Sequence, residues 1–296
     1  MTRDIERLRS FLDHAPQAAL VEVTEAKGST PRETGAHMLV SPQAIFGTIG
    51  GGHLEFLAID RARQLLAGSL PARGAGEGNV NDGHPPRRGL PRQEEGTIIL
   101  DIPLGPEIGQ CCGGRVGLTI RQVDEALRAK LVAQAEADDA ARPRIYVFGG
   151  GHVGHALASA FALLPVHVVV VETRADQFED MPETVETRLT PVPEEMVREA
   201  PAGSAFVVLT HDHALDFLIV AEALKRDDAA YVGMIGSKTK KATFRSWFLK
   251  TAGGTEQAFA RLVSPIGGDA VKDKRPPVIA ALAAAEIMTA LVGTRD

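Results

Sequence analysis

The pattern of hydrophobic and polar positions gives the two halves of the chain a different character. In the first half, short β-branched runs alternate with a few helical stretches, which predicts an α+β domain with a largely β core. The expected strands are residues 18–24, 36–40, 45–49, 97–102 and 116–120, and the expected helices are residues 5–12 and 54–67. Residues 71–96 are rich in Gly, Pro, Arg and Asn without periodicity, so we expect a long mobile loop there.

The second half has the pattern of a parallel sheet with helical crossovers, which is typical of a Rossmann-like domain. The expected strands are residues 145–148, 166–171, 205–209 and 231–235. An alanine-rich, charged helix over 124–140 ends before Pro143 and connects the two halves. We therefore predict an α/β protein with an N-terminal α+β domain (residues 1–123), a linker helix (124–143) and a C-terminal Rossmann-like domain (144–296).

Composition and charge narrow the class of protein. The 296 residues suggest two domains at about 150 residues per domain. The formal net charge of −6 lacks the basic excess of a general nucleic-acid binder or a polybasic membrane module. The longest apolar stretch, residues 278–292, contains Glu286 and is shorter than a membrane span, and no apolar run follows the N-terminus closely. We expect no nucleic-acid partner, no membrane segment and a cytoplasmic location.

The glycine-rich loop at residues 149–154, with the sequence GGGHVG, has the spacing of a dinucleotide fingerprint. It follows an expected strand and precedes a helix expected from residue 155, so its glycines permit a tight turn while the helix N-terminus offers N–H groups to a phosphate. The candidate cofactor-binding residues of this loop are Gly149, Gly151, His152 and Gly154.

Glu172 ends the next expected strand, where a ribose-binding acid would lie. Together with the loop it favours NAD(P), and one interpretation is an NAD(P)-dependent oxidoreductase with His152 or His211 as the acid–base group. The alternative is that the loop is only a turn of a Rossmann scaffold, because a fold does not imply a function.

A second glycine-rich loop lies in the first half, between an expected strand and an expected helix. Its backbone N–H groups are suited to an anion such as a phosphate, and its candidate ligand-binding residues are Gly50, Gly51, Gly52, His53 and Glu55. The alternative is a crowded turn in which Glu55 stabilises the helix N-terminus through the macrodipole.

Cys111 and Cys112 are the only cysteines, and they are adjacent. Their Cα atoms are about 3.8 Å apart, short of the roughly 4.4–6.8 Å that a relaxed disulfide needs, so a reducing compartment and ligand or redox chemistry explain them better. They lie on a glycine turn with Gln110, Gly113 and Gly114, and thiolates are soft metal ligands. The alternative is a pair of small buried hydrophobic residues.

Polar residues follow two strands of the second half. His211, His213 and Asp216 come after the strand at 205–209, where they are either metal ligands or polar residues at a helix start. As metal ligands they favour a metal-dependent hydrolase. After the strand at 231–235, Ser237 is an expected N-cap, and the basic residues beyond it suit either an anion or solvent: Lys238, Lys240, Lys241 and Arg245.

Several of these motifs occur in series, and their order resembles that of one known family. They are KGSTPR at 27–32, GTIGGGHLE at 47–55, QCCGG at 110–114, VFGGGHVG at 147–154, LTHDHALD at 209–216 and YVGMIGSKTKKATF at 231–244. Over nearly the whole chain they resemble the XdhC family of xanthine dehydrogenase accessory proteins. His53 stands where the related CoxI-type proteins carry a cysteine, which places the chain on the XdhC side.

The resemblance implies a carrier rather than an enzyme. Such a protein binds the molybdenum cofactor (molybdopterin), protects it while a cysteine desulfurase supplies its sulfido ligand, and delivers it to apo-xanthine dehydrogenase; a homodimer is also implied. We hypothesise that Cys111 or Cys112 contacts the molybdenum or its incoming sulfur, and that either the 50–52 loop or the 149–154 loop binds the phosphate. The NAD(P)-dependent oxidoreductase remains the alternative.

Overall fold

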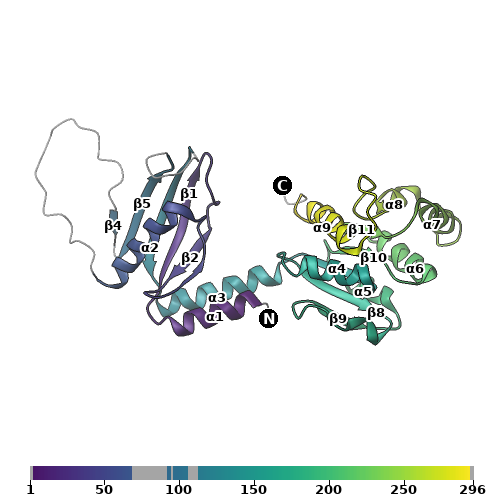
Figure 1. The fold of residues 1–296 in the computed structure, drawn as a ribbon, viewed down its shortest axis with the longest axis horizontal. Coiled ribbons are helices and arrows are strands. Elements are labelled where there is room, and N and C mark those ends of the chain that lie inside the picture. Colours follow the sequence, from purple (N-terminus) through teal and green to yellow (C-terminus); the bar gives the residue numbers. More distant parts are fainter. Residues whose placement is uncertain (1–2, 69–91, 95, 106–112, 294–296) are drawn as a thin grey trace, which may run out of the picture. The chain divides into compact units, whose positions relative to one another are not determined.

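The computed structural model describes residues 3–68, 92–94, 96–105 and 113–293. It divides into two compact units, Met1–Asp138 and Asp139–Asp296 (Figure 1). The division falls near the end of helix α3 (Glu125–Ala140), which lies within the linker helix expected over 124–143. Each unit has its own hydrophobic core.

An antiparallel sheet forms the N-terminal unit. Its strands are β1 (Ala19–Lys27), β2 (His37–Val40), β3 (Ile45–Gly47), β4 (Arg92–Glu94), β5 (Thr97–Pro103) and β6 (Arg115–Gln122). They lie in the order β3-β2-β1-β6-β5-β4, so β1 and β6 join two meanders at the centre of the sheet. An irregularity between Val23 and Glu25 shifts the register of β1 against β6, and the pairing continues to Lys27.

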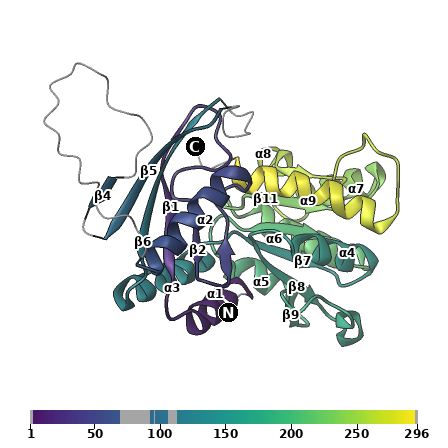
Figure 2. The same cartoon turned by 60° about the vertical axis from the view of Figure 1, so that its left-hand side comes forward.

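Helices cover both faces of this sheet. Helix α2 (Gly52–Leu66) lies across one face, where its buried Leu54, Ala58 and Ala62 recur every four residues (Figure 2). Helix α1 (Arg3–His14) and α3 pack against the other face, where Leu12 meets Leu20 of β1. The predicted α+β domain is therefore confirmed.

Two expectations in this unit were wrong in detail. Part of the loop expected over 71–96 is a strand, because Arg92–Glu94 pairs with β5 as an edge strand. The strand expected over 45–49 ends at Gly47, whose φ of 82° turns the chain out of the extended region. Most of the remaining loop lies outside the described residues.

A parallel sheet forms the C-terminal unit. Its strands are β7 (Arg144–Phe148), β8 (His167–Glu172), β9 (Glu186–Leu189), β10 (Ala205–Val208), β11 (Tyr231–Met234) and β12 (Leu262–Val263). Neighbouring strands run parallel in the order β12-β11-β10-β7-β8-β9, which is the 3-2-1-4-5-6 order of a dinucleotide-binding Rossmann sheet. The strand order therefore reverses between β7 and β10, and the carboxyl ends of these two strands form the edge where such folds bind ligands.

Alternate residues of each strand face opposite layers of helices. Ile145 and Val147 of β7 face the layer of α4 (His152–Phe161) and α9 (Pro276–Val292). Tyr146 and Phe148 face the other layer. That layer contains α5 (Pro193–Glu199), α6 (His213–Leu224), α7 (Lys238–Lys250) and α8 (Glu256–Ala260). The Rossmann-like prediction is confirmed, and no helix in the described part of the chain is long and apolar enough to cross a membrane.

Candidate functional site

In the N-terminal unit, the 27–32 turn (KGSTPR) is packed against the end of the cysteine motif. A Cβ atom added at Gly114 would lie 2.7 Å from the Lys27 carbonyl oxygen and closer still to that of Ser29. Gly28 of the turn has a φ of 72° and faces the Gly114 Cα in return. Two backbone segments more than eighty positions apart in the sequence therefore touch directly, and only glycine permits this approach.

The same turn is packed against the 50–52 loop on its other flank. Gly50 has a φ of 116°, and a Cβ there would lie 2.5 Å from the Pro31 Cβ and 3.3 Å from the Arg32 Cγ. The structure thus brings together Gly113–Gly114 and the 50–52 loop, with the 27–32 turn between them. Gln110, Cys111 and Cys112 lie outside the described residues, and Cys112 directly precedes Gly113 in the chain.

Glu55 holds the 50–52 loop in shape. Its Oε2 accepts hydrogen bonds from the Thr48 hydroxyl (2.6 Å), the Ile49 amide (3.1 Å) and the Gly51 amide (3.0 Å). The Gly50 amide in turn donates to the Thr48 hydroxyl at 3.0 Å. Glu55 was a candidate for contacting the ligand, but in the structure its carboxylate organises the loop that a ligand would meet.

Basic and polar side chains flank this junction. Lys27 is exposed and paired with Glu25, while the Arg32 Nη2 lies 3.3 Å from the Glu33 Oε1. The pKa of the exposed Glu33 is lowered, first by a hydrogen bond from the backbone N–H of Glu33 itself and then by Arg32. Arg32 and Glu33 both line a pocket of about 310 Å³ with Thr48, so this ion pair lies at the edge of the glycine loop.

The 149–154 loop of the Rossmann unit is packed against its surroundings. A Cβ at Gly149 would lie 2.6 Å from the Leu209 carbonyl oxygen, and one at Gly150 would lie 2.7 Å from the Gln177 oxygen. A Cβ at Gly154 would clash with the Gly149 carbonyl oxygen, so position 154 requires a glycine. Nothing lies within 4 Å of a Cβ added at Gly151, which is the N-cap of α4. This helix begins at His152 rather than at the expected residue 155.

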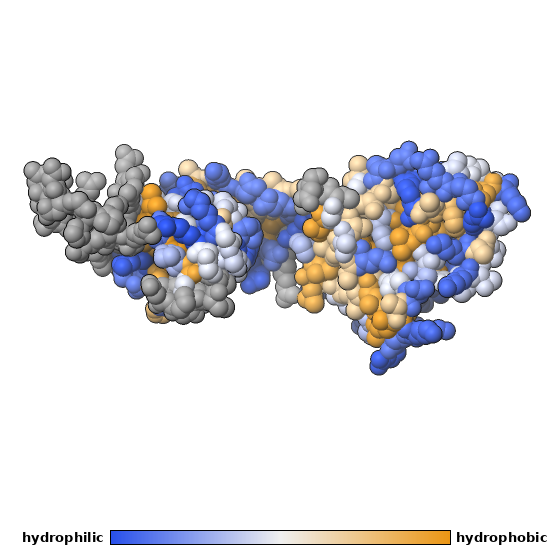
Figure 3. Space-filling view, turned by 90° about the horizontal axis from the view of Figure 1, so that it is seen from above, coloured by the Kyte–Doolittle hydropathy of each residue, from blue (hydrophilic) through white to orange (hydrophobic). Residues whose placement is uncertain are grey.

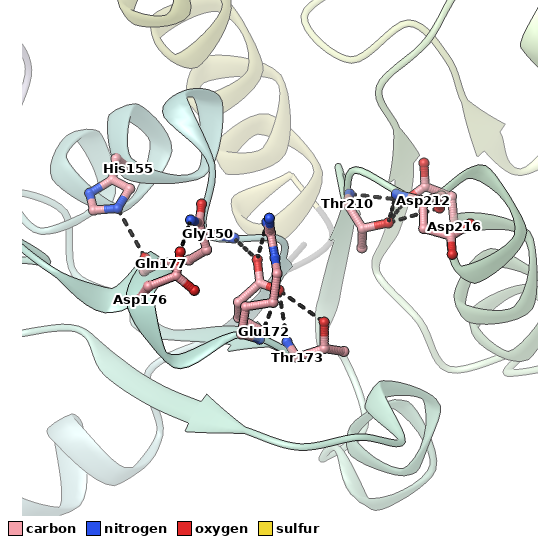
Figure 4. Close-up of polar contacts among 10 residues, drawn as sticks. Gly150, His155, Glu172, Thr173, Asp176, Gln177, Thr210, Asp212 and Asp216 are labelled. Carbon is pink, nitrogen blue, oxygen red and sulfur yellow. Dashed lines mark hydrogen bonds and ion pairs between the residues drawn. The ribbon is translucent and has the colours of Figure 1, made fainter.

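The carboxylate of Glu172, the candidate ribose-binding acid, forms its hydrogen bonds with groups of the protein (Figure 4). Its side chain is only 4% exposed, and its oxygens accept from the Gly150 amide at 3.0 Å and from the Thr173 amide at 2.8 Å. Burial disfavours its charged form, but hydrogen bonds from the Gly150 amide and from Arg174 outweigh burial and lower the pKa of Glu172. A ribose would have to displace these hydrogen bonds. Glu172 therefore connects the end of β8 to the glycine loop.

The polar residues after β10 do not form a metal site. Asp216 is fully buried, accepts from the Thr210 amide at 2.9 Å and hydroxyl at 2.7 Å, and forms an ion pair with Lys240 (Figure 4 shows the contact with Thr210). His211 and His213 are exposed instead. Within the described ranges, no group of three or more His, Cys, Asp or Glu side chains is placed to hold a metal, so the proposed ligand set was wrong.

The residues after β11 that were expected to cap a helix or to bind an anion have different environments. Ser237 is confirmed as the N-cap of α7 and accepts from the Lys240 amide at 3.2 Å. Lys238 is 89% exposed, whereas the Lys240 side chain is 9% exposed, crosses Gly236 and reaches Asp216. The anion-binding interpretation therefore does not extend to Lys240.

Two family models match the chain, one on each half. The model of the XdhC and CoxI family matches residues 12–73, and the model of the XdhC Rossmann domain matches residues 145–287. This chain belongs to the XdhC family. The first match includes the 27–32 turn and the 50–52 loop, and the second includes the 149–154 loop, whereas Gly113 and Gly114 lie outside both matched ranges.

Individual proteins similar to this XdhC-family chain include one curated relative and one solved structure. The chain is 26% identical over 279 residues to the Escherichia coli (strain K12) protein YqeB; the match covers 91% of this chain but only 43% of YqeB. It is 18% identical to a crystal structure described as a xanthine dehydrogenase from Bacillus halodurans, with a TM-score of 0.74 over 100% of this chain and 97% of that one. The second likeness shows a shared fold.

No residue of the 27–32 turn was predicted as a site residue, although the motif contributes to the family resemblance. Pro31 and Ser29 emerge as contacts only through their packing on Gly50 and Gly114. The local signal available was the Gly28 and Pro31 punctuation of a turn directly after a strand.

Proposed function

We propose that this protein is an accessory protein of xanthine dehydrogenase that carries the molybdenum cofactor in its N-terminal unit. Membership of the XdhC family supports the accessory role. The observation that supports the location is the junction of the 27–32 turn with Gly50 on one flank and Gly114 on the other. Cys111 and Cys112 lie outside the described residues, and Cys112 directly precedes Gly113 in the sequence.

The chemistry of the junction suits the chemistry of the cargo. Molybdopterin carries a phosphate, a bicyclic pterin that forms hydrogen bonds, and a molybdenum bound by soft sulfur ligands. The 27–32 turn offers Lys27 and Arg32 as cations, and Cys111 and Cys112 are soft thiols suited to molybdenum or to its sulfur. Lys27 and Arg32 are in exposed ion pairs, which are weak, so we assign the phosphate to these cations rather than to the amides that Glu55 already binds.

A carrier must also give up its cargo. Transfer needs a downhill free-energy difference, so apo-xanthine dehydrogenase has to bind the cofactor more tightly than this protein does. A cysteine desulfurase is the proposed source of the sulfido ligand, a homodimer is the proposed assembly, and the cytoplasm is the proposed location. The protein itself then turns over no purine.

The test compares wild-type protein with the double variant Cys111→Ser/Cys112→Ser. Both are co-produced with the cofactor pathway and purified in the same way, and the pterin released by denaturation is oxidised and measured by fluorescence per chain. We expect the wild type to carry pterin and the double variant to lose most of it with an unchanged melting temperature. A double variant that carries as much pterin as the wild type contradicts the role of the thiols.

The fold of the Rossmann unit supports a second candidate function, that of an NAD(P)-dependent oxidoreductase. The reversal of strand order beside the 149–154 loop favours a nucleotide at this edge, whereas the internal bonds of Glu172 oppose a ribose there. Equilibrium dialysis with NAD(P)H and with molybdopterin separates the two. Tight dinucleotide binding without pterin binding would overturn the carrier.

A further inference from the structure

One aromatic side chain of the N-terminal unit is left in solvent beside the candidate site. The large hydrophobic side chains exposed within the described ranges are Ile45, Phe56, Leu163, Leu189, Val192, Leu218, Val271 and Val292, and Phe56 is the aromatic member of this set. Its side chain is 68% exposed. Apolar residues also reach the surface elsewhere, as the orange areas of Figure 3 show, and the other exposed large hydrophobic side chains of this set are aliphatic.

Phe56 does not stand alone, because the exposed His53 ring lies against it. The two ring centroids are 6.4 Å apart and the ring planes differ by only 22°, which is an offset stack. The residues are three apart on α2, so the helix places them side by side. Together they form an exposed aromatic stack at the start of α2.

The first turn of α2 ties this pair to the 50–52 loop. Leu54, between the two rings in sequence, is buried in the core, and Glu55 turns back to accept from the Gly51 amide. The loop itself touches the 27–32 turn through Gly50 and Pro31. The aromatic pair therefore belongs to the same end of the unit as the basic turn.

We propose that His53 and Phe56 form the stacking surface for the bicyclic pterin ring of the cargo. This inference rests on the proposed carrier function and names a part of the site that the glycine loops leave open. A flat heteroaromatic bicycle stacks on the outer face of this pair, as bases do on aromatic side chains. The cations of the junction then bind the phosphate, while the pair binds the ring.

Phe56 contributes little to the core, so its removal tests binding rather than folding. Truncating an aromatic side chain that stacks on a base weakens binding by about 5-fold to 100-fold, and we expect Phe56→Ala to fall in this range. Phe56→Trp should bind as tightly as the wild type or more tightly. Ile45→Ala is the matched control, because Ile45 is 42% exposed in the same unit and carries no aromatic ring.

The probes are free pterin, titrated by quenching of its fluorescence, and molybdopterin retained during purification. Circular dichroism checks the fold, and light scattering checks the oligomeric state. Weaker binding of both probes by Phe56→Ala alone supports the stacking surface. Unchanged binding by Phe56→Ala overturns it, and so does a loss of dimer in that variant, because Phe56 would then be an interface between two copies.

Failure of this inference is distinguishable from failure of the carrier function. If wild-type protein retains cofactor and the double cysteine variant loses it, while Phe56→Ala retains it, only the stacking surface is wrong. If wild-type protein binds neither probe, the carrier function is wrong and the stacking surface with it.

Discussion

Replacing Gly114 by alanine tests whether the junction in the N-terminal unit is as tight as its geometry indicates. The added methyl group would lie 2.7 Å from the Lys27 oxygen and nearer to the Ser29 oxygen, whereas ordinary van der Waals contact begins at 3.4 Å. Both oxygens belong to the backbone and cannot rotate away. The 27–32 turn must therefore move by roughly 1 Å, a shift of the kind that overpacking forces on a dense site.

Overpacking of this kind costs about 1–3 kcal/mol, which lowers the melting temperature of a unit of this size by roughly 3–12 °C. The shift also carries Arg32 away from the 50–52 loop, so retained pterin should fall several-fold. Gly113→Ala is the matched control, because nothing lies within 4 Å of a Cβ at Gly113.

Melting followed by circular dichroism, and pterin fluorescence per chain, measure the two effects. We expect Gly113→Ala to match the wild type in both. The reasoning is refuted if Gly114→Ala also matches the wild type, or if both substitutions lower stability equally.

The remaining predictions concern the Rossmann unit. Lys240→Met leaves the fully buried Asp216 without its cation and should lower the free energy of unfolding by about 3–5 kcal/mol. Lys238→Met removes a cation that is 89% exposed and should lower it by only about 0–1 kcal/mol. Equal urea midpoints for the two variants would contradict the buried ion pair. Glu172 has a pKa held below its ordinary value of 4.5 by the Gly150 amide and Arg174 despite burial, so its contribution to stability is present above about pH 4.5 and is lost as the pH falls through the lowered folded pKa. The stability lost in Glu172→Gln should accordingly be largest at neutral pH and shrink in urea titrations below pH 4.5, and a loss that is the same at every pH would show that the carboxylate does not act through its charge.

Local signals in the sequence predicted much of the fold. Ser237 after a strand predicted the start of α7, and the spacing of the 149–154 loop predicted a strand, a turn and a helix. Strands β9 and β12 were missed for a physical reason. All four residues of β9 are exposed, and β12 has only two residues, so neither has the apolar run by which a parallel strand is recognised.

The candidate site was less predictable because it depends on contacts between distant segments. No periodicity connects Gly114 to Ser29, and only the folded chain shows that their backbones touch. The error at Asp216 has the same origin. A carboxylate near two histidines suggests a metal, but its partner is Lys240, which comes from the next helix of the fold.

In both halves of the chain a glutamate of the protein itself occupies the donors of a glycine loop: Glu55 binds the Ile49 and Gly51 amides, and Glu172 binds the Gly150 amide. Such loops owe their shape to the polypeptide and not to a guest. A protein that loads and unloads repeatedly gains from this arrangement, since departure of the guest leaves no stranded N–H group and its return requires no reordering of the loop. In the proposed carrier, Glu55 keeps the glycine loop of the N-terminal unit in the same shape before and after release of the cargo.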